Sequence, residues 1–201
     1  MGPDRIYDWA NRFGLGRLTQ IDLPSENPGN LPNPFWDKFN RLKTWFDGDT
    51  ANFSIGQGDL LVSPIQAAVL MAGIANGGNL VKPYIIKSID GKDVRRLQTR
   101  LAHVPLKDST LQIIKAGLRG VVGDQEGTAS VISNAGVAAS GKTGTAQTFS
   151  GRQPHAWFAG YFPSDKPKFT ICVFLEHAGP SLYACQIAGQ IIQQMKEKGL
   201  L

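Results

Sequence analysis

The chain has 201 residues, of which 42% are hydrophobic, and it carries a formal net charge of +5. This length suffices for a substantial folded core, and the composition is that of an ordinary globular domain. The basic residues are dispersed and are not interleaved with aromatic residues, so we predict no nucleic-acid binding. The longest apolar stretch, 60–75, is interrupted by polar residues and is too short to cross a bilayer, and residues 1–5 introduce no signal sequence.

The first 50 residues are predicted to form a short helix and a long loop. Pro3 and Asp4 begin the helix, its apolar residues fall on one face, and Gly14 ends it. Residues 17–50 are rich in proline, glycine and asparagine and show no sustained period, so we expect a loop packed by its own aromatic side chains. These aromatic residues are Phe35, Trp36, Phe39, Trp45 and Phe46, and a surface for a partner or for a lipid-linked molecule is the alternative.

The middle of the chain is predicted to contain two helices and a short strand. Ser63 and Pro64 start the first helix, because serine caps helix N-termini and proline suits the first turn, and residues 76–78 end it. Its predicted buried face consists of Ile65, Ala68, Val69 and Ala72. Residues 84–89 are predicted as a strand and residues 108–123 as the second helix, capped by its first residue, an aspartate.

The C-terminal third changes to aromatic and β-branched runs. Residues 156–162 and 169–175 are predicted as strands of a hairpin, and a final helix follows Ser181. The inner face of that helix is predicted to be Ala184, Ile187, Ala188, Ile191, Ile192 and Met195. Cys172 and Cys185 are expected to be buried thiols, with a disulfide between them as the alternative. Helices followed by antiparallel strands and a last helix indicate an α+β fold.

Residues 136–147, GVAASGKTGTAQ, fit two different motifs. G-x-x-x-x-G-K-T over 136–143 matches a nucleotide-binding phosphate loop, and K-T-G over 142–144 matches an active-site motif of penicillin-binding proteins and β-lactamases. A phosphate loop opens a helix, because the helix N-terminus supplies N–H groups to the phosphates. Residues 144–154 have no helical period and contain glycine and proline breakers, so the nucleotide hydrolase is the weaker alternative.

The K-T-G interpretation fits an exposed strand. Threonines alternate with small residues over 143–148, and with the following hairpin they predict three consecutive antiparallel strands. An edge strand that offers a lysine, threonine hydroxyls and unpaired backbone groups is suited to holding a peptide carboxylate. Small residues at Gly141, Gly144 and Ala146 allow a substrate backbone to approach closely.

Longer motifs around these residues carry a family resemblance. Residues 140–147, SGKTGTAQ, closely resemble the K-T-G strand of class B penicillin-binding proteins. Other stretches similar to that family are FSIGQG (53–58), SPIQAA (63–68), IANGG (74–78), HAWFAGY (155–161) and EHAG (176–179). Residues 14–17, Gly29 and 45–50 resemble the elongation-type members in particular, and the resemblance spans essentially the whole chain.

This resemblance implies the C-terminal part of the penicillin-binding protein/serine β-lactamase-like transpeptidase fold, with an antiparallel sheet packed with helices. It also implies a peptidoglycan D,D-transpeptidase of cell-wall elongation at the extracytoplasmic face of the bacterial inner membrane. In that family a serine attacks the D-Ala-D-Ala bond and a second peptide's amine resolves the acyl-enzyme, while β-lactams acylate the same serine. The implied partners are peptidoglycan stem peptides, β-lactams and membrane proteins of the elongation complex, and no cofactor or metal is expected.

The resemblance also implies residue roles. The catalytic motif would be Lys142, Thr143, Gly144 and Thr145, with the lysine and the threonine hydroxyls holding the substrate carboxylate. The backbone N–H of Thr145 would form half of an oxyanion hole. The implied substrate-binding residues are Ser140, Gly141, Ala146, Gln147 and His155, and for His155 a structural role is the alternative.

The family has three active-site motifs, S-x-x-K, S-x-N and K-T-G. The first two are not found in their family context in the printed sequence. No serine is followed by a lysine three residues later, and the only S-x-N, at 25–27, lies in a Pro/Gly-rich loop. We therefore expect residues 1–201 to be a partial transpeptidase domain that lacks the N-terminal part with the nucleophile and is inactive alone. Exposed apolar surface is expected where that part would pack. The alternative is a non-catalytic module that binds a carboxylate-ended peptide or partner.

Overall fold

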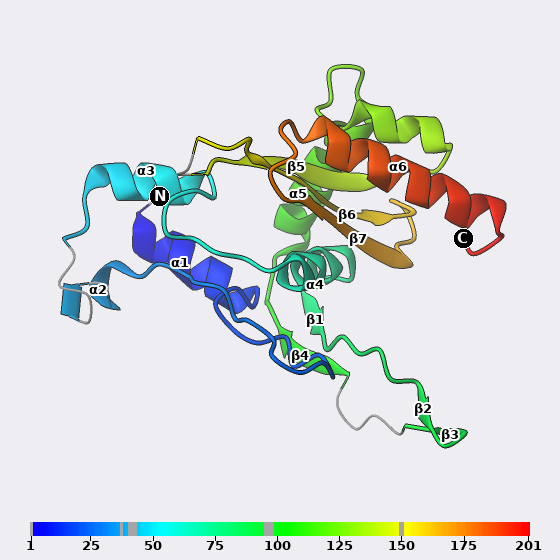
Figure 1. Ribbon diagram of the computed structural model, residues 1–201, viewed down its shortest axis with the longest axis horizontal. Helices are drawn as coiled ribbons and strands as arrows, with labels where there is room; N and C mark the ends of the chain where they lie inside the picture. The colour runs from blue at the N-terminus through cyan, green and yellow to red at the C-terminus, as the bar shows by residue number, and fades with distance from the viewer. Residues whose placement is uncertain (1, 37, 40–43, 95–98, 149–150) are drawn as a thin grey trace.

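A computed structural model describes residues 2–36, 38–39, 44–94, 99–148 and 151–201. Its centre is a three-stranded antiparallel sheet in the order β5-β6-β7, with α4 on one face and α6 on the other (Figure 1). The N-terminal helices lie to one side of this body, and a thin arm carrying β2 and β3 projects from it (Figure 1). None of the described helices is long and apolar enough to cross a membrane.

The three strands are β5 (Ser140–Ala146), β6 (His155–Phe162) and β7 (Phe169–Leu175). β6 is central and pairs with both neighbours, so β5 and β7 each have one edge that no strand among the described residues pairs with. The predicted hairpin and the predicted run of three antiparallel strands are confirmed. The α+β class is confirmed as well.

The side chains of β6 alternate between two cores. Phe158 and Phe162 face α6 (Leu182–Glu197), whereas Tyr161 faces α4 (Pro64–Ala75). The α6 core also contains Ala184, Cys185, Ala188 and Ile192, all fully buried. Small residues on α6 allow the helix to lie close to the sheet, and this packing fixes β6 and therefore the position of β5.

The predicted faces of the two covering helices are confirmed in part. On α6, Ala184, Ala188 and Ile192 are buried, but Ile187 and Ile191 are 37% and 41% exposed, because the buried face is turned toward Cys185. These two side chains add exposed apolar surface to α6, and the packing of a further part of the domain against it stays a prediction. On α4 only Val69 of the predicted set is buried, and the other buried positions are Gln66, Met71, Gly73, Ile74 and Ala75.

The projecting arm differs most from its prediction. β1 (Asn79–Val81) pairs with β4 (Arg100–His103), and β2 (Ser88–Ile89) pairs with β3 (Lys92–Asp93) at the arm's tip (Figure 1). The predicted strand over 84–89 is wrong except for its last two residues. The N–H groups of Ile85 and Ile86 bind the Asp22 carboxylate, at 2.7 and 3.1 Å, instead of a partner strand.

The remaining helices are α1 (Pro3–Arg12), α2 (Pro34–Trp36), α3 (Asp47–Ser54) and α5 (Asp108–Gly123). A 3-10 helix, η2 (Ser130–Ala135), precedes β5. α1 and α5 confirm the predictions, although Lys107 and not Asp108 occupies the N-cap of α5. α2 and α3 were not predicted. The expectation that aromatic residues pack the long loop is confirmed for Trp45, which is half-buried with its ring edge-on to Phe53, but it is wrong for the exposed Phe35, Phe39 and Phe46. The side chain of Trp36 lies outside the described part of the chain.

Both cysteines are free. Burial raises the pKa of the Cys172 thiol to about 11, and it raises the pKa of the Cys185 thiol to about 11 as well. The expectation of buried, unpaired thiols is therefore confirmed for Cys185, and Cys172 is partly buried. The disulfide alternative is wrong.

Gln66 joins the 17–33 loop to α4. Its side chain is 1% exposed, and its amide donates to the carbonyls of Arg17 and Pro28 at 2.8 and 2.7 Å. Its oxygen accepts from the N–H of Ser63 at 2.9 Å, which completes the capping box of α4. Every polar atom of this buried side chain thus has a partner, as burial requires.

We expect Gln66→Leu to lower the free energy of unfolding by at least about 2 kcal/mol, because two carbonyls lose their donor in a buried site. Chemical denaturation followed by circular dichroism measures this change. Gln186→Leu on the exposed side of α6 is the matched control and should change stability by less than about 0.5 kcal/mol. Equal losses in the two variants would contradict the assigned role of Gln66.

Candidate functional site

The outer edge of β5 presents the backbone groups of Thr143 and Thr145. In an antiparallel strand the N–H and C=O of one residue point to the same side. The Thr145 carbonyl accepts from the Gln57 side chain at 3.2 Å, and the Thr143 carbonyl accepts from the Lys142 ammonium at 2.9 Å. Both carbonyls therefore face away from β6, and the N–H groups of the same two threonines point to the same free edge.

Side chains of β5 flank this edge on both faces of the sheet. Successive residues of a strand alternate in direction, so Thr143 and Thr145 share one face and Lys142 lies on the other with Gly144 and Ala146. Gly144 stands opposite Trp157, where a Cβ atom would approach the tryptophan Cβ to 3.3 Å. A ligand lying along the edge is therefore bounded by hydroxyls on one side and by an ammonium on the other.

Two hollows in the described structure adjoin β5. One, of about 720 Å³, is lined by Lys142, Thr128 and Glu126 together with the end of α5. The other, of about 630 Å³, lies between the loop 55–62 and the last residues of β5. Its lining is mainly apolar and includes Trp157, Phe174, Leu60, Leu61 and Val62. The edge of β5 thus lies between a hollow of mixed lining that contains charged side chains and a mainly apolar one.

Thr128 is a site residue that the sequence did not indicate. Its hydroxyl lies 2.9 Å from the hydroxyl of Thr143. Its neighbours are fixed, because Ala129 is fully buried and donates to the Val121 carbonyl at 2.9 Å. A Cβ atom at Gly127 would come within 2.5 Å of the same carbonyl, so that turn is pressed against the end of α5. The Thr128 hydroxyl is thereby held in place to orient Thr143.

His155 anchors the turn that follows β7. Its Nδ1 accepts from the backbone N–H of His177 at 3.0 Å, which places the proton of the neutral ring on Nε2. The ring lies 4.6 Å from that of His177 and 5.3 Å from that of Phe174, centroid to centroid. His155 also lines the apolar hollow beside Gln147. These contacts support the structural alternative while leaving the ring next to the edge.

Ser140 and Gly141 lie at the buried end of β5. Ser140 is 1% exposed and its hydroxyl is 2.9 Å from that of Ser164. A Cβ atom at Gly141 would collide with Phe158, at 2.5 Å. Neither residue presents a side chain to a ligand, so we place them as supports of the strand and not as direct substrate contacts.

The structure brings the remaining predicted residues together on one edge. Lys142, Thr143, Gly144, Thr145 and Ala146 are consecutive in β5, and Gln147 lines the apolar hollow at its end. The phosphate-loop alternative is wrong, because the lysine and the threonine that follows it lie within a strand and not at the start of a helix.

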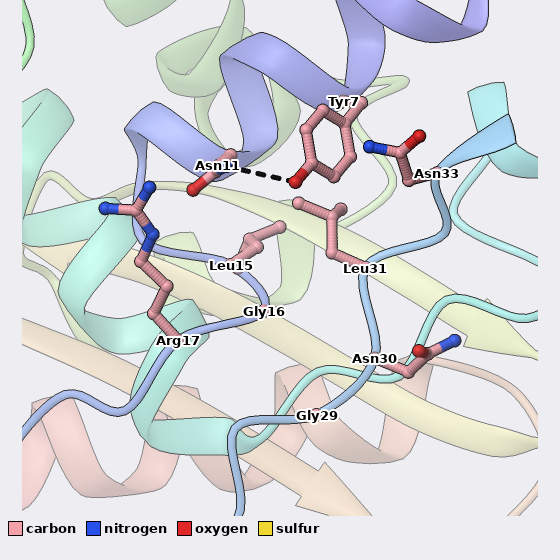
Figure 2. A pocket seen from close by; sticks show the side chains of 9 residues that line it. All are labelled: Tyr7, Asn11, Leu15, Gly16, Arg17, Gly29, Asn30, Leu31 and Asn33. Atoms are coloured by element: carbon pink, nitrogen blue, oxygen red, sulfur yellow. Dashed lines mark hydrogen bonds between the residues drawn. The ribbon is translucent and has the colours of Figure 1, made fainter. Parts of the chain in front are cut away.

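A further hollow of about 390 Å³ lies beneath α1 (Figure 2). Tyr7, Asn11, Arg17 and Asn30 contribute polar groups to it, and the Asn11 amide donates to the Tyr7 hydroxyl at 3.3 Å. Asn11 Oδ1 is buried and has no hydrogen-bond partner among the described residues. None of the predicted site residues lines this hollow, so it is separate from the edge of β5.

Residues 1–196 match the family model described as "Penicillin binding protein transpeptidase domain". The chain belongs to this family, and the resemblance noted from the sequence is confirmed. The fold agrees with this assignment, because the chain superposes on solved penicillin-binding proteins over nearly its full length.

Curated relatives include the peptidoglycan D,D-transpeptidase MrdA of Haemophilus influenzae, 32% identical over 197 residues, which are 89% of this chain and 30% of the relative. MrdA of Acinetobacter baumannii is 33% identical over 207 residues, 94% of this chain and 30% of the relative. Among solved structures, PBP2 of Helicobacter pylori superposes with a TM-score of 0.85 at 28% identity, covering 100% of this chain and 37% of that one. PBP2 of Pseudomonas aeruginosa gives 0.84 at 29% identity, covering 98% and 44%.

The chain therefore spans about a third of the length of the curated relatives that it matches. Residues 1–196, which match the family model, include the whole of β5 with its K-T-G motif. The printed sequence holds no S-x-x-K, so a role of the β5 edge in transpeptidation is left to the proposal below.

We expect His155→Phe to lower the free energy of unfolding by about 0.5–1.5 kcal/mol, because the tilted ring contacts are kept but the acceptor for the His177 N–H is lost. Thermal unfolding measures the change. His103→Phe, at an exposed position of β4, is the control and should have a smaller effect. An unchanged melting temperature in His155→Phe would contradict the anchoring role.

Proposed function

We propose that this chain supplies the carboxylate-binding edge of a peptidoglycan D,D-transpeptidase that acts on D-Ala-D-Ala stem peptides in cell-wall elongation. The observation that carries the proposal is the edge of β5, where outward backbone groups are flanked by two threonine hydroxyls on one face and by the Lys142 ammonium on the other. Charged and neutral donors of this kind suit a peptide that ends in a carboxylate. Membership of the transpeptidase family supports the same substrate class.

A stem peptide would bind as an added antiparallel strand along β5. Its terminal carboxylate would lie among Lys142 and the hydroxyls of Thr143 and Thr145. The carbonyl under attack would accept from the outward N–H of Thr145, which stabilises the negative charge that develops on that oxygen. Thr128 would act through Thr143, by holding its hydroxyl at 2.9 Å.

The nucleophile and the second oxyanion donor would come from polypeptide outside these 201 residues. A serine nucleophile needs a neighbouring base, and the family pattern S-x-x-K that supplies both is absent from the printed sequence. We therefore propose residues 1–201 as the C-terminal part of a transpeptidase domain. The exposed apolar side chains of α6 and the free edge of β7 are suitable surfaces for the remainder of that domain.

Location and partners follow from the same proposal. The reaction takes place on peptidoglycan, outside the bacterial inner membrane, and β-lactams would compete for the same edge. The solved complex of Helicobacter pylori PBP2 with MreC supports a partner among the membrane proteins of the elongation complex.

A non-catalytic peptide-binding module is the second candidate. The absence of S-x-x-K favours it, because the edge of β5 can hold a carboxylate without any nucleophile. The DNA upstream of Met1 separates the two candidates: an in-frame S-x-x-K followed by S-x-N supports the transpeptidase, and unrelated sequence supports the module.

We expect the 201-residue chain to form no covalent adduct with benzylpenicillin, because it has no S-x-x-K serine, and mass spectrometry of the intact protein measures this. A polypeptide extended upstream to include that motif should gain the mass of one penicillin. In the extended protein, Lys142→Ala should slow acylation about 10- to 100-fold, the effect of losing a charged hydrogen bond.

Lys166→Ala, in the exposed turn between β6 and β7, is the matched control and should acylate at the wild-type rate. A penicillin adduct on the 201-residue chain would show a nucleophile elsewhere in it. Equal rates for the Lys142 and Lys166 variants would remove Lys142 from the proposed site.

A further inference from the structure

We propose that the side chain of Gln57 is a displaceable placeholder that occupies the ligand position on β5 until a peptide with a suitably placed N–H replaces it. This inference rests on the proposed function and adds to it a residue that sets ligand affinity and selects for ligand length. The contact that carries it is the hydrogen bond from Gln57 Nε2 to the Thr145 carbonyl, at 3.2 Å.

A side-chain amide at this carbonyl imitates the backbone amide of an added strand. In an antiparallel hydrogen-bonded pair, two opposing residues exchange both of their N–H···O=C bonds. A ligand residue whose carbonyl accepts from the Thr145 N–H therefore aims its own N–H at the Thr145 carbonyl. Gln57 already donates there, so Gln57 and that ligand residue compete for one acceptor.

The backbone of Gln57 is anchored to α3, whereas its side chain contacts β5 through one exposed hydrogen bond. Its backbone N–H donates to the Asn52 carbonyl at 2.9 Å, which ties it to the end of α3. The glycines on either side adopt positive φ angles of 78° and 74°, and no atom lies within 4 Å of a Cβ built at Gly56. The Gln57 side chain is half-buried, lines the apolar hollow and reaches β5 from this anchored loop.

Displacement of the Gln57 amide requires no rearrangement of the fold. The bond to Thr145 is solvent-exposed, and an exposed neutral hydrogen bond contributes little net free energy because water can replace either partner. The adjoining hollow of about 630 Å³ has room for the released side chain. Binding a ligand therefore exchanges one amide for another at the Thr145 carbonyl.

Ligand length decides whether this exchange occurs. N-Acetyl-D-alanine offers a carboxylate and one amide carbonyl, but it has no N–H on the acyl side of that carbonyl. N-Acetyl-D-alanyl-D-alanine offers the same groups and adds that N–H. Only the longer ligand competes with Gln57 for the Thr145 carbonyl, so only its affinity depends on residue 57.

The test titrates both ligands into the ¹⁵N-labelled 201-residue chain and follows the backbone N–H of Thr145 and the side-chain NH₂ of Gln57 by NMR. We compare wild type, Gln57→Met, which keeps the length without the donor, and Gln57→Ala. Gln190→Ala, exposed on α6, is the control. Both Gln57 variants should bind the longer ligand about two- to tenfold more tightly than wild type and the shorter ligand unchanged. In wild type only the longer ligand should shift the Gln57 NH₂ signal.

The possible failures are distinguishable. If wild type binds the longer ligand but the Gln57 variants bind both ligands as wild type does, or bind both more tightly by one factor, the placeholder is overturned and the proposed function stands. If no variant binds either ligand, the proposed function is overturned together with the placeholder. An unshifted Thr145 N–H in the presence of bound ligand would likewise place the ligand elsewhere.

Discussion

The unpaired edge of β5 is the constraint on which the site depends. A strand at the edge of a sheet leaves alternate N–H and C=O groups without a neighbouring strand, and such groups need other partners. Here two of the carbonyls accept hydrogen bonds from side chains. Lys142 donates to the Thr143 carbonyl, and Gln57 donates to the Thr145 carbonyl. The outward N–H groups on the same edge remain directed at the space where a peptide would lie. Under the proposed function, an extended peptide would bind to the backbone groups of β5 that no neighbouring strand uses.

Rigid packing behind β5 makes that edge a defined surface. β6 is buried between α4 and α6, with Phe158 in one core and Tyr161 in the other, so β5 cannot shift without disturbing both. The turn at Gly127 is pressed against the end of α5 and holds Thr128 beside Thr143. The groups that would meet a carboxylate are thus positioned by contacts that exist before any ligand binds, which is the arrangement that favours electrostatic stabilisation.

The sequence predicted the regular parts of this structure well. These parts depend on local sequence patterns. The K-T-G strand and the hairpin after it show strand-like runs of residues, and the start of α4 has a serine cap followed by proline. The strand predicted over 84–89 failed, because its aromatic and β-branched residues are typical of a strand but the N–H groups of Ile85 and Ile86 bind Asp22, more than 60 residues away. Residue type alone could not reveal such a partner.

The same limit applies to the site. Lys142, Thr143 and Thr145 were found because they adjoin in sequence, whereas Thr128 and Gln57 reach β5 from segments 15 and 88 residues away. Gln57 stood in a motif that resembled the family, and that was the one available signal for it. Nothing in the Gly127–Thr128 pair distinguished it from an ordinary turn, so only the packed structure could assign it.

The sheet has two free edges, one on β5 and one on β7, and they face in opposite directions. With two different edges, the β5 edge of one copy can pair with the β7 edge of the next. Such head-to-tail contacts do not close on themselves, so they build a filament and not a closed dimer. The side chains that cover the β5 carbonyls block one of the two surfaces needed for such growth. Gln57 and Lys142 therefore occupy the two β5 carbonyls with which a strand from a second copy would pair, so such a strand would have to displace both side chains.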